Sequence, residues 1–303
     1  MDRRSFLKQI ALWSAGLSLA PPLFRLTNEV MAEPRPSTVS MAEGTDYGAL
    51  VSKVLSPLGG LQNFIKKGQK VVIKPNIGWD RTPEQGANTH PEVVKALARL
   101  ALEAGAAQVL VFDRPCNEER RCYNNSGIKK AIEAIGDRRV NCPYIDSRKF
   151  VPFRISRGKS INEWEFYKEA LEADCYINVP VAKHHSSAGL SLGLKNIMGV
   201  LGGNRSKIHF TMGQALADLN TVLKPVLTIT DATRLLLRNG PQGGDVKDVK
   251  ILNTLLASTD IVAIDAYATT LFNMKPSEIE STQAAHQMGL GEIDLKKIKL
   301  IKV

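Results

Sequence analysis

Short apolar runs alternate with longer stretches of helical periodicity along most of the chain, from about residue 70 to the C-terminus. The apolar runs are rich in Val, Ile and Leu, which is typical of strands that are buried on both faces. They predict strands at 70–74, 107–113, 173–180, 225–232 and 297–303. The periodic stretches predict helices at 90–106, 126–136, 212–223, 260–272 and 276–289.

Strands and helices that alternate in this way predict an α/β fold, with a mainly parallel sheet and helices on both faces. The 303 residues are enough for one large domain or for two small lobes around a core, and a weak boundary near residue 150 keeps two lobes open. Residues 33–46 are rich in Pro, Ser and Gly and predict a loose linker. We therefore assign 33–69 to a linker and N-terminal segment and 70–303 to the α/β domain.

The first 32 residues look like a targeting signal and are left out of the fold. Arg3 and Arg4 precede Phe6 and a moderately apolar stretch, and residues 30–32 offer a place where a peptidase could cut. This pattern resembles a twin-arginine signal peptide over residues 1–32; an ordinary secretory signal and an amphipathic first helix are the alternatives. The resemblance implies the twin-arginine export machinery as a partner. It also implies a periplasmic or exported location, with membrane anchoring if the signal stays uncleaved.

The charge balance favours an anionic partner. Lys and Arg number 40 against 30 Asp and Glu, a formal net charge of +10, which suits nucleic acid, anionic lipid or a small carboxylate or phosphate. Aromatic residues make up only 6% and do not interleave with a basic run, so we expect no nucleic-acid partner. A small anionic molecule is the ligand that the composition supports best.

The cysteines leave two states open. Cys116, Cys122, Cys142 and Cys175 are even in number, so one or two disulfides are compatible with export, and the first two could close a small loop. Unpaired cysteines are the alternative. The sequence has no CxxC pair and no CxxCxxC run, so we expect no iron–sulfur cluster bound by this chain.

Polar clusters follow three of the predicted strands, at the point where each strand ends. Because ligands in open α/β sheets bind at the carboxyl ends of the strands, we expect the clusters to meet in one cavity. A single lysine after a strand is usually a solvated loop residue, and only the three clusters together favour a site. In chain order their members are Lys74, Asn76, Lys183, His184, His185, Asp231 and Arg234.

A glycine-rich stretch after the second cluster adds further candidates. Gly189 and Gly193 let the backbone approach a ligand closely. Lys195 and Arg205 supply positive charge for phosphate or carboxylate, and the imidazole of His209 titrates near neutral pH or binds a metal. The stretch lacks the nucleotide P-loop and dinucleotide-fold signatures. The structural alternative is a glycine-rich loop with solvated lysines.

Five blocks of sequence occur in the order found in one protein family. They are "IKPN", "THPEVV", "INVPVAKHHSSAGLSLGLKNIMG", "NGPQGG" and "STDIVAIDAYATTLF". These blocks resemble those of the domain-of-unknown-function family 362, over roughly residues 70–303, and the resemblance implies an α/β domain. Members often carry an attached ferredoxin-type module, whose cysteine motif this sequence does not show. A separate redox partner protein is therefore among the partners we consider.

A shorter block resembles nickel-pincer lactate racemase. "HSSAGLSLGLK" keeps that family's order of a histidine, Ala-Gly, a Gly-rich stretch and a lysine ten residues after the histidine. The resemblance implies acid–base work by His185, contact of Lys195 with the pincer nucleotide, and nickel ligation by His209. The family's arginine beside this lysine is Leu194 here. A metal or a nickel-pincer-type cofactor is accordingly the kind of cofactor we consider.

We therefore expect an exported protein with a cationic Lys/His pocket, acting as an enzyme, an isomerase or an oxidoreductase, on a small anionic substrate. The competing interpretation is a non-catalytic binding protein for a small anion or a metal cofactor, serving a redox partner; an interaction scaffold comes third. An enzyme should place a lysine or carboxylate within hydrogen-bond reach of a histidine. We assign catalysis to His185 and Lys195, cofactor binding to Lys74, Asn76, Lys183, His184, Asn196 and Arg205, and metal binding to His209.

The twin-arginine assignment predicts the effect of a conservative double substitution. Replacing Arg3 and Arg4 by Lys keeps the charge and removes the planar guanidinium groups. We expect export of the folded protein to stop, which cell fractionation measures directly. Undiminished export of the double variant would show that residues 1–32 are a different kind of signal.

Overall fold

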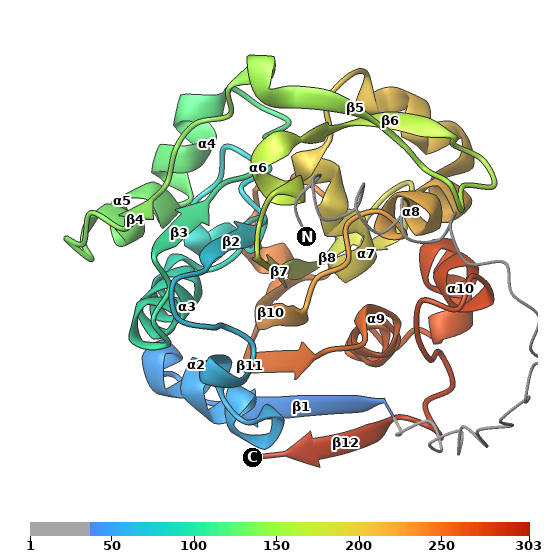
Figure 1. Cartoon of the computed structure of the whole chain (residues 1–303). Helices are drawn as coiled ribbons and strands as arrows, with labels where there is room; N and C mark the ends of the chain where they lie inside the picture. The colour runs from blue at the N-terminus through green and yellow to red at the C-terminus, as the bar shows by residue number, and fades with distance from the viewer. Residues whose placement is uncertain (1–36) are drawn as a thin grey trace, which may run out of the picture. The chain divides into compact units, whose positions relative to one another are not determined.

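The computed structural model describes residues 37–303, so the twin-arginine segment lies outside the described residues. The main sheet has ten strands (Figure 1), and six of its nine strand pairings are parallel. This confirms the predicted α/β class. Across the sheet the order is β12 (Lys299–Lys302), β1 (Thr38–Glu43), β11 (Val249–Ser258), β10 (Leu227–Leu236), β7 (Cys175–Val179), β2 (Lys70–Pro75), β3 (Gln108–Val111) and β4 (Val140–Asn141), with β8 (Val181–His185) paired to β10 and β9 (Gly189–Ser191) paired to β8.

Helices cover both faces of the sheet, as predicted (Figure 1). In β2, Val71 and Ile73 pack into one core and Val72 into the other, because side chains alternate along a strand. On the first face lie α2 (Tyr47–Leu55), α3 (Pro91–Glu103), α4 (Glu119–Asn125) and α5 (Ile128–Glu133). On the second lie α6 (Lys168–Leu171), α7 (Gly193–Asn196), α8 (Met212–Asn220), α9 (Ile261–Thr270) and α10 (Glu280–Gln287), with the small hairpin of β5 (Phe150–Arg154) and β6 (Glu163–Tyr167).

The local signals in the sequence explain where the helices begin and end. Helix α3 has Pro91 in its first turn, and the His90 side chain caps it by accepting the backbone N–H of Glu92. The chain leaves this helix through Gly105, whose φ of 94° suits glycine. Helix α9 is capped by Asp260, which accepts two backbone N–H groups. All five predicted helices and all five predicted strands are present.

The N-terminal part of the described chain differs from the prediction. Residues 38–43 form β1 rather than a linker, and β1 pairs with β11 on one side and with β12 on the other. Four of its six residues are buried, with Val39 fully inside the core. Pairing with distant strands stabilises β1. The Ser- and Gly-containing sequence around it carries no local signal that predicts a strand.

The predicted boundary near residue 150 is not visible either. The described residues, 37–303, form one compact unit. Residues 150–167 fold back as the β5–β6 hairpin, whose Phe166 is fully buried in the core of the second face. In the part of the chain that the structure describes, no helix is both long and apolar enough to cross a membrane.

The position of β1 inside the sheet predicts a sharp contrast between two substitutions. Val39→Asp places an unpaired charge in the core and should lower the free energy of unfolding by about 3 kcal/mol or more. Glu43→Ala, at the exposed end of the same strand, should change it by less than about 0.5 kcal/mol. Urea unfolding of both variants measures the difference. Equal, small effects would fit a linker instead of a strand.

Candidate functional site

A cavity of about 590 Å³ opens at the carboxyl ends of β2, β3 and β7. The segment after each strand supplies part of its wall: Asn76 and Trp79 after β2, Asp113 after β3, and Pro180 after β7. Residues 198–209 form much of the remaining wall. Because the three strands are parallel, their carboxyl ends meet at one edge of the sheet, which is where a ligand site is expected in this class.

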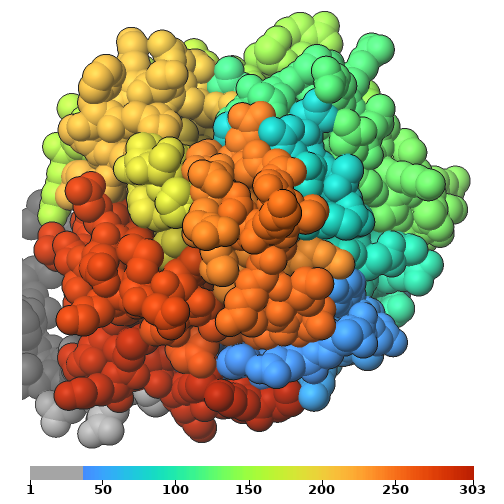
Figure 2. Space-filling view, turned by 180° about the vertical axis from the view of Figure 1, so that it is seen from behind, coloured from blue at the N-terminus to red at the C-terminus, as the bar shows by residue number. Residues whose placement is uncertain are grey.

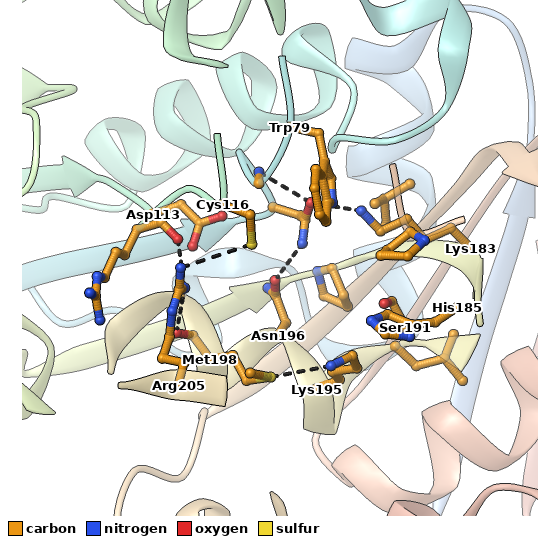
Figure 3. Close-up of a pocket in the computed structure, with 18 of the residues that line it drawn as sticks. Trp79, Asp113, Cys116, Lys183, His185, Ser191, Lys195, Asn196, Met198 and Arg205 are labelled. Carbon is orange, nitrogen blue, oxygen red and sulfur yellow. Dashed lines mark hydrogen bonds between the residues drawn. The ribbon is translucent and has the colours of Figure 1, made fainter. Parts of the chain in front are cut away.

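Eight of the nine predicted site residues line this cavity. Lys183 and His185 point into it from β8, and in Figure 3 they lie with Lys195 on one side, while Asp113, Cys116 and Arg205 lie on the other. The structure thus brings together side chains that are far apart in the sequence, although their individual roles stay predictions. The eight residues are Lys74, Asn76, Lys183, His185, Lys195, Asn196, Arg205 and His209.

His184 is the exception, and its predicted place in the pocket is wrong. It belongs to β8, where neighbouring side chains alternate between opposite sides, so it points away from Lys183 and His185. Its Nδ1 accepts the backbone N–H of Gly240 at 3.1 Å. The Ser186 N–H also donates to the Gly240 carbonyl, and Figure 2 shows the orange segment around residue 240 beside the yellow segment around 186. His184 therefore holds the segment around Gly240 in place.

The third predicted cluster also lies outside the cavity. β10 does not end near residue 231 but continues to Leu236, because it pairs there with both β8 and β11. Asp231 accepts the backbone N–H of His90 at 2.7 Å, and the Arg234 guanidinium donates to the Tyr47 hydroxyl at 2.9 Å. These two residues fasten the start of α3 and the N-terminal helix α2.

Lys183 is a buried lysine without a carboxylate partner in residues 37–303. Only 1% of it is exposed, and its Nζ donates to the Ala87 carbonyl and to Asn76 Oδ1. Its Nζ also lies over the Trp79 ring, 5.9 Å from the centroid. Burial, assisted by the nearby charges of Lys195 and Lys74, lowers the pKa of Lys183 to about 7.

Lys195 has an even less polar environment. Its Nζ contacts two thioether sulfurs, Met198 Sδ at 3.2 Å and Met212 Sδ at 3.5 Å, which are weak acceptors. Within the described chain it forms no ion pair. Burial, with a smaller contribution from the charge of Arg205, lowers the pKa of Lys195 to about 8. Both lysines are therefore partly neutral near physiological pH.

A buried carboxylate fixes the helix that carries Lys195. The two Asp265 oxygens accept the backbone N–H groups of Gly193 and Leu194 at 2.7 and 2.8 Å. A Cβ on Gly193 would lie 2.7 Å from Asp265 Oδ1, so the close approach that requires glycine here is to this carboxylate and not to a ligand. Burial raises the pKa of Asp265 to about 7. Gly189, the other predicted contact, lies outside the cavity as the first residue of β9, with a φ of 71°.

Lys74 differs from the other two lysines because it is neutralised within the protein. Its Nζ forms a buried ion pair with Asp113 Oδ1 at 2.9 Å and donates to Asn196 Oδ1 at 2.7 Å. Burial lowers the pKa of Lys74, and the charge of Asp113 opposes that shift. The Asn196 amide donates to Asn178 Oδ1 and to the Lys74 carbonyl. Gly199 lies against the ion pair, where a Cβ would be 1.6 Å from Asp113 Oδ1.

Arg205 is also engaged by the protein. Its guanidinium donates to the carbonyls of Arg114, Pro115 and Met198, at 2.7 to 3.1 Å. Arg114 in turn donates to the Leu201 and Gly203 carbonyls. The two arginines hold the wall of the cavity in place and add positive potential. Among the described residues, Lys183 and Lys195 are the cavity lysines without a carboxylate partner.

The two histidines of the cavity meet at Ser187. The backbone N–H of Ser187 donates to His185 Nδ1 at 3.2 Å, so the neutral ring carries its proton on Nε2. The Ser187 hydroxyl lies 3.3 Å from His185 Nδ1 and 3.5 Å from His209 Nδ1. Burial and the charges of Lys195 and Lys183 lower the pKa of His185 to about 3. His185 is therefore a neutral hydrogen-bond donor.

Metal and cysteine chemistry have limited support in the described residues. Residues 37–303 contain no group of three or more His, Cys, Asp or Glu placed to hold a metal ion. The rings of His185 and His209 lie 6.2 Å apart between centroids, so a metal near His209 would need donors from a cofactor or a substrate. All four cysteines are free. The Cys116–Cys122 disulfide is not formed, since Cys122 is buried in α4 and Cys116 lines the cavity.

Sequence reasoning missed several residues that shape this site. Asp113 ends the predicted strand "AQVLVFD", so its position at a strand end was a signal that could have found it. Asp265 lies inside a helix 70 residues after Lys195 in sequence, and nothing local links the two. Trp79, Met198 and Met212 likewise reach the lysines only through the tertiary fold.

The fold and the site can now be compared with known proteins. Residues 71–270 match the family model described as "Domain of unknown function (DUF362)". The chain belongs to this family. The thylakoid-associated protein sll1697 of Synechocystis sp. is 30% identical over 270 residues, which cover 84% of this chain and 80% of that protein.

Two solved structures are more distantly similar to this DUF362 protein. One is a protein from Thermotoga maritima, with a TM-score of 0.45 and 14% identity over 81% of this chain. The other is the lactate racemase apoprotein from Thermoanaerobacterium thermosaccharolyticum, with a TM-score of 0.46 and 15% identity over 73% of this chain. The matches span 60% and 54% of those two chains.

The different environments of two lysines predict opposite effects of the same substitution. Lys74→Met leaves Asp113 buried without its partner, so the free energy of unfolding should fall by about 3–5 kcal/mol. Lys195→Met removes a partly desolvated amine that no carboxylate balances and adds a third thioether, so stability should stay within about 1 kcal/mol or rise. Urea unfolding at pH 7 compares the two. A large loss for Lys195→Met would mean that its ammonium has a partner in the native protein.

Proposed function

We propose that this DUF362 protein is an enzyme that binds a small organic anion in the cavity and performs acid–base chemistry on it with Lys195 and His185. The observation that carries the proposal is the presence of two cavity lysines, the buried Lys183 and the half-buried Lys195, that lack a carboxylate partner in residues 37–303. A buried cation without a partner destabilises the protein unless an anion binds beside it. The cavity of about 590 Å³ has room for such a molecule.

The three reactive side chains suit different tasks. Lys183 is anchored by oxygen acceptors, and its ammonium is suited to pair with the anionic group of the substrate. Lys195 has a pKa lowered to about 8, so a useful fraction of its amine is unprotonated and can accept a proton. His185, a neutral ring with its proton on Nε2, can donate a hydrogen bond to an oxygen that gains negative charge in the reaction.

A metal-containing cofactor is a further part of this proposal. The resemblance of the 185–195 block to lactate racemase motivates it, and Lys195, Arg205 and His209 all line the cavity. Any metal would be held mainly by the cofactor, because the described residues provide only the two imidazoles of His185 and His209 there. Such a cofactor would supply a hydride or electron acceptor that this chain's side chains do not provide.

The second candidate is a non-catalytic binding protein for the same anion or for a metal cofactor, serving a redox partner. One observation favours it: among residues 37–303, neither histidine of the cavity hydrogen-bonds to a lysine or a carboxylate. An enzyme whose catalytic hydrogen bonds form only when the substrate is bound also lacks them without substrate. Turnover of the bound anion separates the two candidates, since both predict binding.

Export belongs to the proposal as well. The pattern of residues 1–32 supports transport by the twin-arginine machinery to the periplasm, with or without retention as an anchor. The name of the cyanobacterial relative places that protein at the thylakoid, which fits a location at or across a membrane. Insertion of a cofactor before transport would explain the use of an export route for folded proteins.

Anion binding should depend on Lys195 and on pH. Isothermal titration with inorganic phosphate and with small carboxylates should show an affinity about tenfold or more lower for Lys195→Ala, because one charge-assisted contact is lost. The pKa values of Lys183 and Lys195 lie near 7 and 8, so both ammonium groups lose their charge as the pH rises. Affinity should therefore fall by about tenfold between pH 7 and pH 9, with protons taken up on binding.

A surface lysine on the same wall provides the matched control. Lys207 belongs to η6 (Arg205–Thr211), is exposed and does not line the cavity. Lys207→Ala should bind the anions like the parent protein. Equal affinities for Lys195→Ala, Lys207→Ala and the parent, with no pH dependence, would remove the anion site from the cavity.

A further inference from the structure

Lys195 has the surroundings of an amine that reacts as a nucleophile. The other cavity lysines use their Nζ groups for strong oxygen acceptors: Lys74 for Asp113 and Asn196, and Lys183 for Ala87 and Asn76. Among the described residues, Lys195 Nζ contacts only the two methionine sulfurs as hydrogen-bond acceptors. A thioether does not hold an ammonium as a carboxylate does, so loss of the proton frees the nitrogen lone pair toward the cavity.

The same cavity contains the groups that a carbonyl substrate would need. Lys183 offers an ammonium for a carboxylate, while the face of Trp79 lies over that amine. The His185 Nε2–H is free of hydrogen bonds to the described residues and belongs to a ring that lines the cavity. Lys183, His185 and Lys195 all line this cavity, and the charge of Lys195 contributes to the lowered pKa values of the other two.

We propose that the substrate class is the small 2-oxo acids and that Lys195 forms a covalent imine with the keto carbon. This inference rests on the proposed function, and it adds the class of substrate and a nucleophilic role. The Lys195 nitrogen attacks the carbonyl carbon, and the electron pair of the C=O bond moves to oxygen, which takes a proton from His185 Nε2. The nitrogen then gives up its own proton, which returns to the imidazole. The remaining N–H proton then passes by the same imidazole to the hydroxyl, while the nitrogen lone pair forms the C=N bond and the C–O bond breaks. Water leaves, so amine plus 2-oxo acid gives imine plus water.

The choice of substrate follows from the two requirements of the site. An anionic group is needed to balance Lys183, and an adjacent carbonyl is needed for the amine to attack. Phosphate and simple carboxylates meet only the first requirement, so they should occupy the cavity as reversible competitors. An imine next to a carboxylate also makes the neighbouring C–H bonds more acidic, which connects this step to acid–base chemistry at the same site.

Reductive trapping tests this inference on the purified full chain. Pyruvate, glyoxylate or 2-oxoglutarate is added with sodium cyanoborohydride at pH 8, and intact-mass and peptide mass spectrometry locate the reduced adduct. The expected result is one adduct per chain, on the peptide that contains Lys195. At saturating 2-oxo acid, which compensates for the weaker anion binding at high pH, its yield should rise between pH 7 and pH 9, and inorganic phosphate should suppress it.

Four variants make the assignment specific. Lys195→Arg keeps the cation and cannot form the imine, and Lys195→Met replaces the amine by a residue that fits beside Met198 and Met212; both should give no adduct. Lys207→Arg should label like the parent protein. Lys183→Met should need at least about tenfold more pyruvate for the same yield, since it loses a charge-assisted contact.

The outcomes separate this inference from the proposed function. Labelling spread over exposed lysines and unchanged in Lys195→Met overturns the imine. If calorimetry shows phosphate and pyruvate binding that depends on Lys195, and no adduct forms, the imine is overturned while the anion site stands. If neither binding nor an adduct occurs, both proposals fall.

Discussion

The buried ion pair between Lys74 and Asp113 is the interaction on which the site depends. It joins the ends of β2 and β3, and Asn196 extends the same network to α7. Two charges inside a protein are stable only when each satisfies the other and the remaining donors have acceptors. Here Asn196 Oδ1 accepts from Lys74 Nζ, and the backbone N–H of Ile77 donates to Asp113 Oδ2. The cavity floor is therefore fixed before any ligand binds.

Above this floor the protein places two lysines that it does not neutralise. Burial lowers the pKa values of Lys183 and Lys195 to about 7 and 8, which means that their charged forms are less favourable in the protein than in water. An anion bound beside these lysines would offset that cost by providing a charge partner. Groups that destabilise the fold and become useful when a ligand binds are typical of functional sites. Lys74, already paired, serves stability, although it has the same side chain.

Asp265 helps to fix the position of Lys195, because it binds the two residues that precede Lys195 in the chain. This carboxylate holds the first two residues of α7 through their backbone N–H groups, and the turn of helix that follows directs Lys195 to the cavity and Asn196 to Lys74. His185 is fixed in a comparable way by the Ser187 N–H, which selects the tautomer with the proton on Nε2. The orientation of both reactive groups is thus set by backbone contacts, which vary little with solvent conditions.

The sequence by itself determined the α/β class, the order of ten elements and the segments that hold the site, because hydrophobic periodicity, helix caps and polar residues after strands are local signals. It placed eight cavity residues correctly in one region, and it missed β1, whose strand conformation depends on pairing with β11 and β12 at the other end of the chain. Only the tertiary structure decided which lysine is paired and which is not. Lys74 and Lys183 look alike in sequence, and their difference comes from Asp113, which a parallel neighbouring strand brings beside one of them. The environment of a charge depends on contacts between distant segments, and no local pattern encodes it.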